Sequence, residues 1–85
     1  MYYVYILKGQ LDRKLYIGYT ANLKDRLLRH QRGEVLSTKP RRPFEFIFYE
    51  AYKCKEVARR RERYFKTTKG KSSLYLMIRN SLKSD

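Results

Sequence analysis

Hydrophobic residues alternate or cluster in three short stretches of the chain, at residues 2–7, 15–20 and 44–52. Each stretch is rich in β-branched and aromatic side chains and is bounded by turn-forming or charged residues, a pattern typical of strands. The three stretches therefore predict three short strands.

The first two predicted strands are close enough in the sequence to form a hairpin. With residues 9–12 as the connection, antiparallel pairing places Tyr5 opposite Tyr16 and Val4 opposite Ile17. Opposite residues share a face of the sheet, so we expect the two tyrosine side chains side by side.

Three further stretches have helical spacing. Asn22 is a good N-cap for a helix that ends at Gly33, and residues 34–43 follow as a basic loop. A second helix is expected over residues 55–68, with Gly70 breaking it before a last short helix. The order strand, strand, helix, strand, helix, helix predicts an α+β fold, with a three-stranded antiparallel sheet flanked by helices in one domain of residues 1–85.

Positive charge dominates the composition. The chain has 21 Lys and Arg against 8 Asp and Glu, a formal net charge of +13 over 85 residues. The excess is shared between the two halves of the sequence, so it belongs to the domain rather than to a tail. The partner is therefore expected to be a polyanion such as a nucleic acid.

Other sites are excluded by residue counts. One cysteine and one histidine cannot build a disulfide within the chain or a Cys/His zinc site, so a metal ion would be held mainly by oxygen. No apolar run reaches the 18 or more residues of a membrane span, and we expect a reducing, cytoplasmic location without membrane contact.

An ordered set of motifs resembles the GIY-YIG nuclease superfamily over nearly the whole chain. The first half of the family signature is Tyr3-Val4-Tyr5, which departs from Gly-Ile-Tyr at two positions and keeps the tyrosine. The second half is intact, as Tyr16-Ile17-Gly18. Arg26 and His30 resemble the arginine and histidine of the family's first helix. Glu62, with its neighbours Arg61 and Arg63, resembles the catalytic glutamate of the small stand-alone bacterial members.

The resemblance implies phosphodiester hydrolysis assisted by one divalent ion, Mg²⁺ or Mn²⁺. Glu62 is then the metal ligand, since Mg²⁺ commonly uses one or two carboxylates together with water and phosphate oxygens. Arg26 would hold the scissile phosphate with its planar fork of donors. Tyr5 would be the general base, Tyr16 would orient water or phosphate, and His30 would assist Tyr5 or contact phosphate.

Each of these roles has a plainer alternative. Glu62 could form an ion pair on the helix surface with a neighbouring arginine, and His30 could be a packed histidine. A phenol with a pKa near 10 is a poor base unless a nearby positive charge stabilises its phenolate. If Tyr5 is not the base, His30 is the next candidate.

Further cations are expected to follow the nucleic-acid backbone, which gives affinity but little sequence information. They are Lys39, Arg41, Arg42, Arg59, Arg60, Arg63 and Lys66. The chain would therefore be a weakly sequence-specific or structure-selective DNA endonuclease, targeted by a protein partner or by forming a homodimer.

Two other classes of protein fit parts of the sequence. A non-catalytic nucleic-acid-binding module that keeps the nuclease fold is favoured by Tyr3 and Val4, where the first motif departs from the family. A small ribosome- or RNA-associated protein is favoured by composition alone. Only the nuclease requires Glu62.

Overall fold

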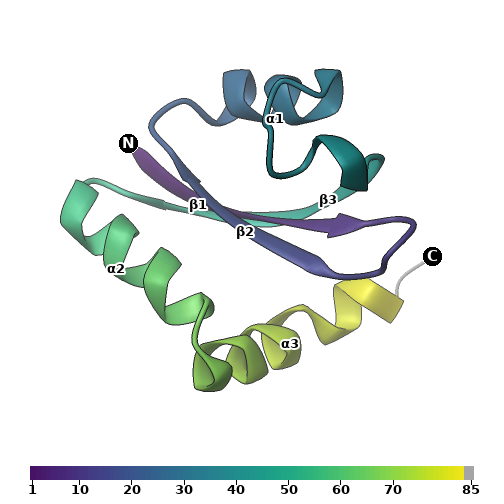
Figure 1. Cartoon of the computed structure of the whole chain (residues 1–85). Coiled ribbons are helices and arrows are strands. Elements are labelled where there is room, and N and C mark those ends of the chain that lie inside the picture. Colours follow the sequence, from purple (N-terminus) through teal and green to yellow (C-terminus); the bar gives the residue numbers. More distant parts are fainter. Residues whose placement is uncertain (84–85) are drawn as a thin grey trace.

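The computed structural model describes residues 1–83, with side chains through residue 79, and confirms the predicted order of elements. Within these residues a three-stranded antiparallel sheet has the order β2-β1-β3. Figure 1 shows α1 on one face of this sheet and α2 and α3 on the other. The elements are β1 (Tyr2–Gly9), β2 (Leu15–Thr20), α1 (Leu23–Arg32), the short 3₁₀ helix η1 (Lys39–Arg41), β3 (Phe44–Tyr52), α2 (Lys55–Phe65) and α3 (Thr68–Lys83).

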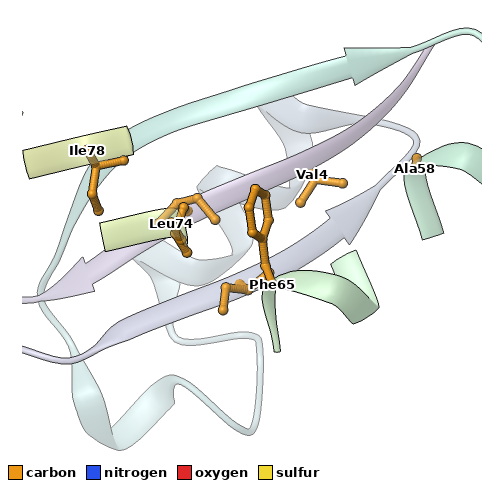
Figure 2. Close-up of a cluster of buried hydrophobic side chains, with 7 residues drawn as sticks. Val4, Ala58, Phe65, Leu74 and Ile78 are labelled. Carbon is orange, nitrogen blue, oxygen red and sulfur yellow. The ribbon is translucent and has the colours of Figure 1, made fainter. Parts of the chain in front are cut away.

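The hydrophobic core fills the space between the sheet and the pair α2 and α3 (Figure 2). Val4 and Ile6 of the central strand meet Phe65 and Leu74 there, and all four side chains are buried. Full burial of one such side chain stabilises the fold by about 1.5–3 kcal/mol. Tyr5, between Val4 and Ile6, points to the opposite face, so β1 supports the core with one face and a polar cluster with the other.

The hairpin loop begins one residue later than predicted. It covers residues 10–14 between β1 and β2, and it is closed by the Gly9 N–H, which donates to the Lys14 carbonyl, and by the Arg13 N–H, which donates to the Gly9 carbonyl, each at 2.9 Å. Arg13 closes the loop in the left-handed region, with φ of 62°. The predicted connection over residues 9–12 is therefore wrong.

The strand register shifts with the loop. Tyr5 pairs with Gly18 rather than Tyr16, and Val4 pairs with Tyr19 rather than Ile17. A shift of two residues leaves every side chain on its predicted face. Tyr5 and Tyr16 consequently still share a face, as diagonal rather than direct neighbours.

The first helix begins and ends as predicted. The Asn22 side chain accepts a hydrogen bond from the Asp25 N–H at 3.2 Å, and Gly33 takes the left-handed conformation with φ of 77°. These caps fix the position of α1, and hence the points from which its polar side chains reach the sheet.

The helix predicted over residues 55–68 ends at Phe65, three residues earlier than predicted. Gly70 lies inside the next helix, α3, and does not separate the two helices as predicted. The Thr67 hydroxyl donates to the Tyr64 carbonyl at 2.7 Å and accepts from the Gly70 N–H at 2.9 Å, which starts α3 immediately. A Cβ on Gly70 would overlap the Tyr64 carbonyl. Glycine is needed here for close contact between the two helices.

Candidate active site

Four of the predicted site residues meet on the face of the sheet that α1 covers. The Tyr5 phenol oxygen lies 2.6 Å from His30 Nε2, and Arg26 Nε donates to the same oxygen at 3.4 Å. The Tyr16 ring lies 5.2 Å from the His30 ring and 6.3 Å from the Tyr5 ring, centroid to centroid. We call Tyr5, Tyr16, Arg26 and His30 the Tyr5 cluster.

The spacing of Arg26 and His30 brings both to the sheet. Residues four apart lie on one face of a helix, and the first turn of α1 is fixed by its cap. Of the residues of α1, all of which the structure describes, His30 alone is buried. The fully buried contact of α1 is thus a polar side chain, and Leu23 and Leu27 of the helix are half-buried.

Gly18 makes room for the Tyr5 phenol. The two residues are paired across β1 and β2. A Cβ on Gly18 would overlap the Cζ and Oη atoms of Tyr5. The glycine of the second motif thus allows the tyrosine of the first motif to lie flat across the neighbouring strand.

Thr38 completes the polar contacts of the imidazole. Its Oγ1 lies 2.8 Å from His30 Nδ1, and its hydroxyl donates to the Val35 carbonyl at 3.3 Å. The residue has no exposed surface. The sequence predicts only a loop at Thr38, because a threonine among loop residues carries no sign of a contact with a helix eight residues earlier.

Burial controls the protonation of the Tyr5 cluster. It raises the pKa of Tyr5 to about 12, although the hydrogen bond from Arg26 acts in the opposite direction. Burial, followed by the positive charge of Arg26, lowers the pKa of His30 to about 4. At neutral pH the phenol keeps its proton and the imidazole is neutral, so Arg26 alone does not produce a phenolate.

Acidification should destabilise the protein through His30. The pKa of His30 is about 4 in the folded chain against an ordinary 6.5. At pH values between these two, the unfolded chain binds more protons than the folded chain, so the free energy of unfolding decreases as the pH is lowered. We expect a loss of about 2 kcal/mol in the free energy of unfolding between pH 7 and pH 5, measured with urea. His30→Gln is the matched control and should lose much less; equal losses would contradict a neutral buried imidazole.

Glu62 lies on α2, across the sheet from α1, and is not hydrogen-bonded to the Tyr5 cluster. Its carboxylate pairs with Lys66 Nζ at 2.9 Å and with Arg59 Nε at 3.7 Å, the kind of helix-surface pairing that the sequence leaves open. Arg59 also lies over the Tyr19 ring of the edge strand β2, 4.9 Å from its centroid. The charge of Glu62 still contributes to the raised pKa of Tyr5, so the carboxylate acts on the cluster electrostatically.

Comparison with known proteins places this arrangement in a family. Residues 1–75 match the GIY-YIG catalytic domain. The chain belongs to the GIY-YIG family. The family resemblance predicted from the motifs is thereby confirmed.

Small bacterial proteins named UPF0213 are similar to this GIY-YIG chain. One from Bacillus pumilus (strain SAFR-032) is 40% identical over 77 residues, which cover 88% of this chain and 78% of that protein. One from Clostridium perfringens (strain 13 / Type A) is 36% identical over 86 residues, covering 100% and 91%. The solution NMR structure of the UPF0213 protein BH0048 from Bacillus halodurans has a TM-score of 0.58 and 33% identity, covering 91% of this chain and 85% of that one.

The metal-ligating capacity of the GIY-YIG chain is small. Among the described residues, no three His, Cys, Asp or Glu side chains gather into a site. Glu62, whose side chain is only 15% exposed, offers a lone carboxylate on α2. This donor suits a hard ion that keeps most of its waters, such as Mg²⁺, and does not suit a closed zinc site.

The cations expected to contact the backbone of a nucleic acid divide into two groups. Lys39, Arg41 and Arg42 lie on the basic loop beside the cluster, Arg59, Arg60 and Arg63 lie on α2, and Lys66 directly follows α2. Arg41 is already engaged, because its Nε pairs with Asp12 at 2.7 Å and its guanidinium lies over the Phe44 ring.

Over the described residues, no helix is long and apolar enough to cross a membrane.

Proposed function

We propose that this GIY-YIG protein is a metal-dependent endonuclease that hydrolyses phosphodiester bonds in DNA, with weak sequence preference or selectivity for DNA structure. The observation that carries the proposal is the buried Tyr5 phenol, hydrogen-bonded at 2.6 Å to His30 and approached by Arg26. Burying three polar groups together opposes folding. Such clusters with strongly shifted pKa values are typical of sites that transfer protons.

Arg26 supplies the fixed positive charge. Its guanidinium is half-buried and carries five donors, of which Nε reaches Tyr5. The remaining donors can hold non-bridging oxygens of a phosphodiester at the mouth of the cluster. Charge that develops on these oxygens during attack is then stabilised by a group already in place.

Tyr5 and His30 together accept the proton of the attacking water. Because the pKa of Tyr5 is about 12, the phenol is protonated at neutral pH before the reaction begins. As the water oxygen bonds to phosphorus, its proton passes to Tyr5 Oη while the phenol proton passes to His30 Nε2. The bond from phosphorus to the sugar oxygen breaks, and this oxygen keeps the electron pair and takes up a proton from solvent. Burial lowers the pKa of His30 most and the positive charge of Arg26 lowers it further. A phosphate paired with Arg26 would offset this second effect, so the imidazole becomes a better acceptor when substrate is bound.

Glu62 would hold the divalent ion. Bound there, the ion would neutralise charge on the phosphate and on the leaving oxygen. Glu62 is paired with Lys66 in this structure, so the lysine must release the carboxylate for the ion to bind. The Lys66 side chain is 53% exposed, so the lysine can turn to solvent, and a pair open to solvent on one side contributes only about 0–1 kcal/mol.

The proposal is tested by incubating the purified protein with plasmid, single-stranded and branched DNA, and RNA, with Mg²⁺, with Mn²⁺ or with a chelator. Metal-dependent cleavage of DNA is expected. Preferential cleavage of RNA would contradict the choice of substrate. Tight binding with no cleavage under any condition would favour the non-catalytic module over the nuclease.

A further inference from the structure

We propose that Thr38 is a positioning residue that fixes the tautomer of His30, so that Nε2 of the imidazole is the nitrogen that receives the Tyr5 proton. The consequence for catalysis rests on the proposed nuclease function. The placement of the imidazole proton does not, and it can be measured without any substrate.

The hydrogen bonds around the imidazole are all satisfied in one arrangement of protons. The Thr38 hydroxyl donates to the Val35 carbonyl at 3.3 Å, so Oγ1 accepts from His30 Nδ1–H at 2.8 Å. Nε2 then carries no proton and accepts from Tyr5 at 2.6 Å, and the phenol oxygen accepts from Arg26 Nε–H. This assignment follows from the network of partners.

The opposite tautomer leaves the network incomplete. His30 Nε2–H and Arg26 Nε–H would then both point at the Tyr5 oxygen, and the phenol proton would have to turn away from the imidazole. The Thr38 hydroxyl would turn to Nδ1 and give up the Val35 carbonyl. In that state Nε2 already holds a proton and cannot receive the one from Tyr5.

Thr38 is held in position independently of the imidazole. Its N–H donates to the Val35 carbonyl at 3.1 Å, and its own carbonyl accepts from the Arg41 N–H at 2.9 Å. Arg41 in turn is tied to Asp12 of the hairpin loop by a 2.7 Å ion pair. The basic loop is thus fixed to the sheet, and it presents Oγ1 to His30 from a constant direction.

Aromatic rings surround the rest of the imidazole. Tyr5, Tyr16 and Phe44 lie with their ring centroids 5.5, 5.2 and 6.3 Å from that of His30. Among the described residues, the polar partners of the two ring nitrogens are Tyr5 Oη and Thr38 Oγ1. The Thr38 hydroxyl therefore decides which nitrogen is protonated.

The experiment combines NMR with kinetics. His30 is the one histidine in the chain, so a long-range ¹H–¹⁵N spectrum of the labelled protein reports a single imidazole. We expect the proton on Nδ1 in the parent protein and a shift toward Nε2 in Thr38→Val, which removes the hydroxyl at nearly constant volume. On DNA, Thr38→Val should lower kcat about tenfold to a hundredfold with KM unchanged. Thr38→Ser should restore both readouts, and Ser37→Ala, at an exposed neighbour, should change neither.

The outcomes separate the two proposals. A parent spectrum with the proton on Nε2 would overturn the role of Thr38, as would a Thr38→Val protein with the parent tautomer and rate. If no protein cleaves nucleic acid but Thr38→Val still shifts the tautomer, the nuclease proposal fails and the role of Thr38 in placing the proton stands. Should Thr38→Val not fold, the parent and Thr38→Ser spectra decide: a proton on Nδ1 in both supports the role.

Discussion

Replacing Glu62 by glutamine is expected to abolish metal-dependent cleavage while leaving the fold intact. Glutamine keeps the size of the side chain but loses the negative charge that would hold the divalent ion. Stabilisation of the reacting phosphate by a metal ion is worth several kcal/mol, and about 1.4 kcal/mol corresponds to a tenfold change in rate. We therefore expect the cleavage rate to fall about a thousandfold or more, measured with saturating Mg²⁺ on the best DNA substrate.

The control for this substitution lies on the same helix. Glu56 is exposed in the first turn of α2, and Glu56→Gln changes the net charge by the same amount. It should cleave DNA at close to the parent rate. The ion pairs of Glu62 with Lys66 and Arg59 lie at the protein surface, so Glu62→Gln should unfold within about 1 kcal/mol of the parent. A folded Glu62→Gln protein that cleaves at the parent rate would remove Glu62 from the site.

Replacing Tyr5 by phenylalanine is expected to produce the second large loss of activity. The substitution keeps the ring but removes the oxygen that contacts His30 and Arg26. General base catalysis contributes about 10²–10⁴-fold to a rate, and we expect kcat to fall by that factor. The loss should persist across the pH range, because no titration restores a missing hydroxyl.

A tyrosine far from the cluster provides the comparison. Tyr75 is exposed on α3, on the other side of the sheet, and Tyr75→Phe should cleave normally. Tyr5→Phe leaves His30 Nε2 without its buried partner, which costs about 1–3 kcal/mol, so folding is checked by circular dichroism before the rates are compared. Normal cleavage by a folded Tyr5→Phe protein would move the role of base to His30, and the double variant with His30→Gln would test that assignment.

Local chemistry explains the parts of the fold that the sequence predicts correctly. Asn22 and Gly33 define α1 because a side-chain cap and a left-handed glycine act within a few residues of the chain. The residues at i and i+4 of α1 then reach the sheet together. Tyr5 and Tyr16 fall on one face because strand periodicity tolerates a register error of two residues.

The sequence-based predictions fail at positions where the backbone adopts a conformation unusual for the residue type, or where a contact between distant residues determines the local structure. Arg13 adopts a positive φ, which is uncommon for arginine and is not predicted from its residue type. The hairpin register therefore differs by two residues from the predicted one. Gly70 looks like a helix breaker, but contact with the Tyr64 carbonyl makes glycine a requirement inside α3. Thr38 meets His30 only after the basic loop folds back on the sheet, and no sequence period connects them.

The way α1 is seated has a consequence for how activity is lost on heating. Tyr5 lies on the central strand, bonded to a neighbour on each side, and such strands open only with global unfolding. His30 is the one fully buried residue of α1, and Leu23 and Leu27 are only half-buried, so detachment of α1 exposes less apolar surface than opening the core and belongs to the lower-energy openings of the molecule. Arg26 and His30 would then leave the phenol while the sheet and core stay folded. Inactivation should therefore precede the cooperative melting of the domain.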